Sequence, residues 1–95
     1  MAKRLMIEGR VQGVGYRASF AAQARMLGLA GWVRNRHDGA VEACVSGNQP
    51  AEEAIIAWAQ QGPPAAQVKQ VQVSEVDEGD EASVAAGPFA ILPTV

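Results

Sequence analysis

Cysteine and histidine are scarce in this 95-residue chain, which has one of each. The single Cys44 excludes an intramolecular disulfide, and Cys44 with His37 gives too few ligands for a structural zinc site. No apolar run approaches the roughly 18 residues of a membrane-spanning helix, and no secretory leader opens the chain. We therefore expect a cytoplasmic protein with no membrane partner and no metal.

Acidic residues are almost absent before position 37, where Glu8 alone opposes seven basic residues. Those basic residues are Lys3, Arg4, Arg10, Arg17, Arg25, Arg34 and Arg36. The acids gather instead near the other end, from Glu75 to Glu81. The net charge of −2 argues against a general nucleic-acid binder, whereas the basic half favours a small anionic ligand.

Length and periodicity predict one domain over residues 1–95, working as a monomer. Alternating and helical apolar patterns predict strands at about 4–11, 30–36, 40–45 and 68–76, and helices at about 16–27 and from Pro50 to the Gly62-Pro63-Pro64 stop. The broken phase of the fourth strand leaves room for a β-bulge. The acidic segment 77–87 is expected to be a mobile loop, and Phe89 with Ile91 is a candidate for a short closing strand.

The resulting order is β-α-β-β-α-β. Two helices and a hairpin between crossover connections predict an α+β, ferredoxin-like split βαβ fold, in which an antiparallel sheet carries both helices on one face. This architecture serves many unrelated functions, so function must come from particular residues.

Residues 8–17, E-G-R-V-Q-G-V-G-Y-R, join the first strand to the first helix. Gly13 and Gly15 permit the positive φ of a concave turn, and the first N–H groups of the helix have no partner within it. Arg17 adds a fork of donors suited to phosphate or carboxylate oxygens. The stretch is compatible with an anion cradle, although two glycines before a helix also serve simply to turn the chain, and both interpretations stay open here.

Three other polar residues have simple structural interpretations. Asn35 precedes an Asp-Gly turn and, by itself, is typical of a turn residue. His37 lies in that turn and is expected to be solvated rather than a general base. Cys44 is expected to be a small buried residue, because no neighbour in the sequence activates it as a nucleophile.

Two sequence blocks taken together are more specific. V-Q-G-V-G-Y-R at 11–17 is followed by G-W-V-R-N at 31–35, then by D-G-A-V-E at 38–42, Gly47 and Gly62-Pro63-Pro64. In these features, from about residue 5 to 73, the chain closely resembles the acylphosphatase family. Tyr16 stands where many members carry phenylalanine.

The resemblance implies hydrolysis of acyl phosphates to a carboxylate and inorganic phosphate by in-line attack of water, without metal or cofactor. It implies that Arg17 binds the phosphoryl oxygens and that Asn35 positions the water. The backbone cradle would be the loop Gln12, Gly13, Val14, Gly15 and Tyr16. Such a reaction needs charge stabilisation and an aligned water more than a strong general acid, because a carboxylate is a good leaving group.

Two alternatives from other classes are a non-catalytic anion-sensing domain and an RNA-binding module. RNA binding on a ferredoxin-like sheet requires aromatic residues on its open face, and Trp32 is the one plausible candidate. A pure anion sensor has no evident need for a water-positioning amide, so Asn35 separates it from the hydrolase.

Overall fold

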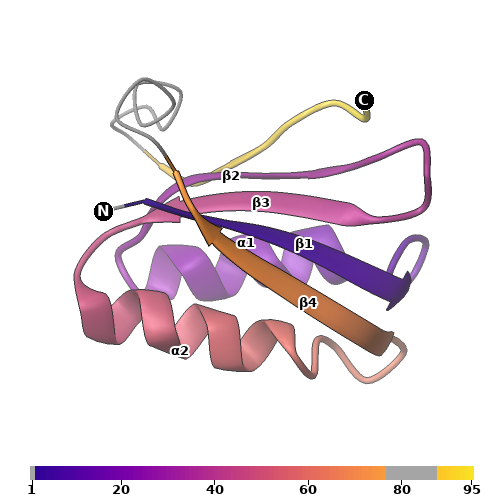
Figure 1. The fold of residues 1–95 in the computed structure, drawn as a ribbon, viewed down its shortest axis with the longest axis horizontal. Helices are drawn as coiled ribbons and strands as arrows, with labels where there is room; N and C mark the ends of the chain where they lie inside the picture. Colours follow the sequence, from indigo (N-terminus) through magenta and orange to yellow (C-terminus); the bar gives the residue numbers. More distant parts are fainter. Residues whose placement is uncertain (1, 77–87) are drawn as a thin grey trace.

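The computed structural model describes residues 2–76 and 88–95 (Figure 1). Its elements are β1 (Lys3–Arg10), α1 (Tyr16–Met26), β2 (Ala30–Asn35), β3 (Val41–Ser46), α2 (Gln49–Ala59), β4 (Gln67–Glu75) and β5 (Ala90–Ile91). The predicted order is confirmed, including the short closing strand. The expected mobile loop at 77–87 lies outside the described residues.

The strands form one sheet in the order β4-β1-β3-β2-β5. The four long strands pair antiparallel, as predicted for the ferredoxin-like arrangement. The two-residue β5 pairs parallel with β2, through Trp32 with Ala90 and Val33 with Ile91, so the complete sheet is mixed.

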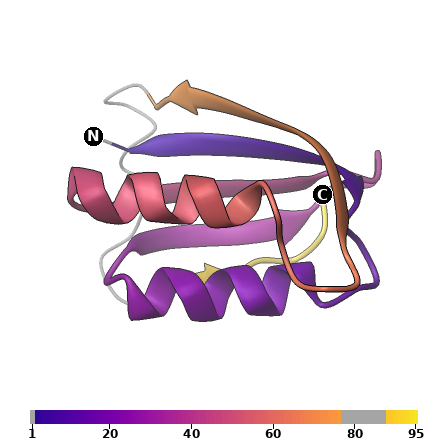
Figure 2. The ribbon, with the colours of Figure 1, turned by 90° about the horizontal axis from the view of Figure 1, so that it is seen from below.

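Both helices pack on the same face of the sheet, as Figures 1 and 2 show from two directions. Alternation along the strands directs Leu5, Ile7 and Val33 toward that face, where all three are fully buried. Phe20 of α1 and Ile55 of α2 cover them and are equally buried. Within residues 2–76 and 88–95, no helix lies on the second face of the sheet.

A β-bulge lies in β4, as the broken apolar phase of this strand in the sequence suggested. Glu8 pairs with Gln70 and Gly9 pairs with Val68, so Lys69 is the extra residue between two consecutive pairs. This extra residue returns Val68 to the core-facing side that Val71 already occupies, which explains the broken apolar phase.

The end of β2 lies beside the loop that follows β1. Both strands pair antiparallel with β3 between them and therefore run parallel to each other, so their C-terminal ends meet at one edge of the sheet. Asn35 ends β2 and is opposite Val41, which is buried on the helix-covered face. Directly opposite residues share a face, so Asn35 also faces the helices. The sequence alone did not establish that the end of β2 lies close to this loop.

Candidate active site

The loop between β1 and α1 is concave and open. Gly13 and Gly15 have φ values of 74° and 80°, in the left-handed region that disfavours other residues. A Cβ placed on either glycine would meet no atom within 4 Å, so nothing from the protein fills the space above them. The loop therefore offers its backbone to a ligand.

The N-terminus of α1 adds further donors at the same place. Gly15 is the N-cap residue, no side chain caps the helix, and no acid lies in the first turn. The unpaired N–H groups of a helix N-terminus and its positive dipole end favour a bound anion. The backbone geometry is therefore compatible with the predicted cradle.

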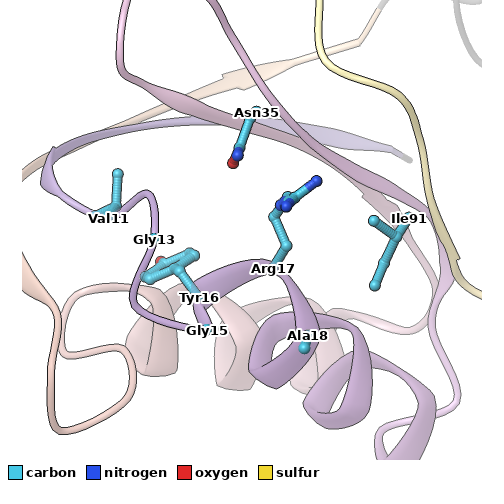
Figure 3. A pocket seen from close by; sticks show the side chains of 8 residues that line it. All are labelled: Val11, Gly13, Gly15, Tyr16, Arg17, Ala18, Asn35 and Ile91. Atoms are coloured by element: carbon cyan, nitrogen blue, oxygen red, sulfur yellow. The ribbon is translucent and has the colours of Figure 1, made fainter.

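A pocket of about 200 Å³ lies over this loop (Figure 3). Its lining comes from the loop, the first turn of α1, the end of β2 and β5. The lining residues are Val11, Gly13, Gly15, Tyr16, Arg17, Ala18, Asn35 and Ile91. The structure therefore brings together Arg17 and Asn35, the two residues that the family resemblance singles out.

Asn35 presents an unused acceptor. Its Oδ1 is buried and has no hydrogen-bond partner among the described residues. Figure 3 shows the amide extending from β2 toward the loop and Arg17. A buried acceptor left unpaired costs about 1–3 kcal/mol, so native proteins usually supply a water or ligand for it. The geometry is what a site for a bound water requires.

Arg17 is the half-buried cation of the pocket. No hydrogen bond or ion pair engages its side chain within residues 2–76 and 88–95. It projects from the first turn of α1 into the same space as Asn35 (Figure 3). A cation at the positive end of a helix is unfavourable by itself, so the arrangement favours a bound anion.

Gln12 connects the loop to the β2–β3 hairpin. Its Nε2 donates to the carbonyl oxygens of Arg36, at 2.7 Å, and Ala40, at 2.9 Å. Its side chain therefore faces the hairpin rather than the pocket, and Val14 packs against the core. Any contact of these two predicted cradle residues with an anion would come from their backbone.

Tyr16 holds the start of α1 against α2. Its ring is buried and lies 5.5 Å from that of Trp58, and its hydroxyl donates to the Ala59 carbonyl at 2.9 Å. Burial raises the pKa of the phenol, so the hydroxyl stays protonated and remains a donor. Tyr16 contributes to the cradle by anchoring its helical end.

Three arginines on the opposite face surround one buried carboxylate. Glu42 is 1% exposed and pairs with Arg4, with Arg34 at 2.9 Å and with Arg36 at 3.2 Å. Burial opposes its ionisation, but the hydrogen bonds and charges of Arg34 and Arg4 outweigh it, so the pKa of Glu42 is lowered. Arg34 and Arg36 are thus engaged in an ion-pair cluster with Glu42.

The remaining candidates have structural roles. His37 is exposed in the hairpin turn, and its backbone N–H donates to the Val95 carbonyl at 2.7 Å. Cys44 is buried on the open face beside Trp32, which the Arg34 guanidinium covers at 4.5 Å. Residues 2–76 and 88–95 contain no group of three or more His, Cys, Asp or Glu able to hold a metal ion.

Three pocket residues were not predicted from the sequence, namely Val11, Ala18 and Ile91. Val11 is the first residue of the 11–17 block and Ala18 directly follows it, so their positions in the sequence were the available signal. Ile91 had no such signal, because only the pairing of β5 with β2 brings it to the site.

Comparison with known proteins identifies the family of this chain. A family model described as Acylphosphatase matches residues 3–87. The chain belongs to the acylphosphatase family. An acylphosphatase of Azoarcus sp. (strain BH72) is 54% identical over 93 residues, covering 98% of this chain and 90% of the relative.

Solved acylphosphatases share the fold as well. The Bacillus subtilis structure is 34% identical with a TM-score of 0.82, covering 96% of this chain and 97% of that one. The Coxiella burnetii structure is 30% identical with a TM-score of 0.84, covering 96% and 90%. These likenesses support an acylphosphatase hydrolase and do not favour the anion-sensing or RNA-binding alternatives. No helix in the described part of the chain is long and apolar enough to cross a membrane.

Proposed function

We propose that this acylphosphatase hydrolyses acyl phosphates with the phosphoryl group seated on the loop from Gln12 to Tyr16, contacted by Arg17. Asn35 holds the attacking water. The observation that carries the proposal is the buried, unpartnered Oδ1 of Asn35 in the same pocket as the Arg17 guanidinium. One group offers an acceptor for water and the other offers donors for phosphoryl oxygens.

The reaction follows from these roles. Asn35 Oδ1 accepts a hydrogen bond from the water and directs its oxygen toward phosphorus. The new P–O bond forms as the bond from phosphorus to the acyl oxygen breaks, and the acyl group leaves as a carboxylate. The proton lost by water goes to the phosphate product. No strong general acid is needed, because the carboxylate is a good leaving group.

Charge stabilisation falls to the backbone and Arg17. The first N–H groups of α1 have no partner within the helix, its first turn lines the pocket, and the Arg17 guanidinium adds donors there. These donors are held by the fold before the substrate arrives, and preorganised donors are the effective kind. Losing one typically reduces the rate by about 10²–10³-fold.

The protein has one substrate partner in this account, a small acyl phosphate, and uses no metal or cofactor. Among residues 2–76 and 88–95, no acid lines the pocket. We also propose that it works as a monomer in the cytoplasm. The lone buried Cys44 suits a reducing compartment.

Phosphate release from benzoyl phosphate and acetyl phosphate tests the function directly. The purified protein should accelerate both reactions, should keep its activity in EDTA, and should be inhibited competitively by inorganic phosphate. Activity that EDTA abolishes and Mg²⁺ restores would require a metal-assisted mechanism. Complete inactivity of folded protein toward both substrates would contradict the proposal.

A further inference from the structure

The pocket has two chemically different sides. Gly13, Gly15 and Asn35 provide its polar side, whereas Ala18 and Ile91 provide an apolar side. Figure 3 shows the Arg17 side chain rising between Asn35 and Ile91, with Ala18 on the helix below. In the proposed mechanism the phosphoryl group of the substrate lies at the polar side. The apolar side has no role in that mechanism and is available to contact the acyl group.

Ile91 is an unusual surface residue. Its side chain is 44% exposed although most large apolar residues of the chain are buried. Its backbone is well fixed, because β5 pairs with β2 and Leu92 N–H donates to the Val33 carbonyl at 2.9 Å. An exposed apolar side chain on a fixed strand is ready to lose solvent contact when a ligand binds.

The preceding residue strengthens this attachment. Phe89 is 1% exposed and packs 5.8 Å from Phe20, measured between ring centroids. The Arg25 guanidinium donates twice to the Phe89 carbonyl, at 2.8 Å and 3.1 Å. Ile91 is therefore presented to the pocket by a strand that is held on both sides.

The pocket offers no second cation for the acyl group. Arg17 is the only charged residue among the described residues that line it. Arg4, Arg34 and Arg36 are committed to Glu42. An acyl group with its own carboxylate or phosphate would meet an apolar side chain where it needs a counter-charge.

We infer that Ile91 and Ala18 form the acyl-group subsite and select acyl phosphates whose acyl group is uncharged and apolar. The inference rests on the proposed phosphoryl site and extends it to the other half of the substrate. The pocket volume of about 200 Å³ indicates a small acyl group, because pockets for drug-sized ligands have volumes of about 300–1,000 Å³. Benzoyl phosphate fits this description better than succinyl phosphate, whose acyl group ends in a carboxylate.

The test compares Ile91→Ser with the wild type on benzoyl, acetyl and succinyl phosphates. Ile91→Ser should raise KM for benzoyl phosphate about tenfold, the low end of the effect of removing an apolar contact from a pocket. KM for acetyl phosphate and the inhibition constant of inorganic phosphate should stay unchanged, because neither ligand reaches the subsite. Ile91→Lys supplies the missing cation and should lower KM for succinyl phosphate.

Val73→Ser is the matched control, since Val73 is also on an edge strand and is 43% exposed, away from the pocket. It should change no KM. Equal KM changes for all three substrates in Ile91→Ser, or none, would overturn the subsite while leaving the proposed function standing. A folded wild-type enzyme inactive on all three substrates would overturn both. Far-UV circular dichroism confirms that each variant is folded.

Discussion

The two helices of this protein begin in opposite ways. The Asn48 side chain caps α2, where its Oδ1 accepts from the Ala51 N–H at 2.9 Å. Glu52 in the first turn of α2 accepts from the Gly47 N–H at 3.3 Å. By contrast, α1 begins at Gly15 with no side-chain cap, and Arg17 stands in its first turn.

This contrast separates a structural helix end from a functional one. An N-cap side chain stabilises a helix by about 1 kcal/mol, and an acid in the first turn also suits the dipole. α1 lacks both contributions, and Arg17 opposes its dipole. The helix end that leaves its donors unused is also the one beside the pocket. The unused donors are therefore interpreted as a ligand site rather than as a poorly made helix.

Among the variants compared here, removal of Arg17 from the first turn of α1 should reduce activity most. Arg17→Gln should lower kcat/KM by about 10²–10³-fold, because it removes charged donors from the phosphoryl group. KM and the inhibition constant of inorganic phosphate should both rise, since the contact exists before and during the reaction. Steady-state kinetics on benzoyl phosphate measure all three quantities.

Arg4→Gln is the control for Arg17→Gln, because it removes the same charge from the opposite face of the sheet. It should leave kcat/KM unchanged while disturbing the Glu42 cluster. Near-normal hydrolysis by folded Arg17→Gln protein would show that catalysis does not require the Arg17 guanidinium.

Gln12→Ala should have an intermediate effect. It removes both hydrogen bonds from the loop to the hairpin, so the cradle and Asn35 are no longer held at a fixed separation. A misplacement of about 1 Å can reduce a rate by up to about 10²-fold, and we expect a kcat loss of about tenfold. The inhibition constant of phosphate should change much less, because the cradle itself remains.

Gln72→Ala supplies the corresponding control on the exposed β4 strand. If Gln12→Ala and Gln72→Ala have the same kcat, the loop keeps its position without this tether.

Asn48→Ala should have the smallest effect on activity. The change removes the cap of α2 and should lower the free energy of unfolding by about 1 kcal/mol. Urea denaturation measures that loss, and kcat/KM for benzoyl phosphate should be unaltered. Asn48→Asp, which keeps a capping oxygen, should recover the stability. A clear loss of activity in Asn48→Ala would contradict a purely structural role for the N-terminus of α2.

Local patterns in the sequence predict the elements and half of the site. Period-two and helical spacings identify the strands and helices, and the glycines of 11–17 predict the open loop because positive φ is a local property. Arg17 follows from the same stretch. These features depend on neighbours in the sequence, and the structure agrees with them.

Contacts between distant segments were beyond sequence reasoning. The burial of Glu42 requires arginines from three separate positions to converge on it, and an alternating strand predicts it as exposed. The two hydrogen bonds of Gln12 cross from one loop to another. Ile91 reaches the pocket through a two-residue strand whose parallel pairing no local pattern specifies.

The central claim is that the unpaired oxygen of Asn35 holds the attacking water, and Asn35→Ala tests it most directly. Removing a buried acceptor that has no protein partner should cost little stability, so a kinetic change can be assigned to the reaction. The account predicts that kcat on benzoyl phosphate falls by about 10²–10³-fold, as for loss of a preorganised catalytic group. KM and the inhibition constant of inorganic phosphate should stay close to wild type.

Asn35→Asp completes this measurement, because it keeps the shape of the side chain and places an anion beside an anionic substrate. Its kcat should fall as well, and like-charge repulsion should weaken phosphate binding. Aspartate is also a good residue before a hairpin turn, so a purely structural Asn35 would tolerate the change. A folded Asn35→Asp enzyme with nearly full kcat/KM would contradict the account, and the water would need another partner.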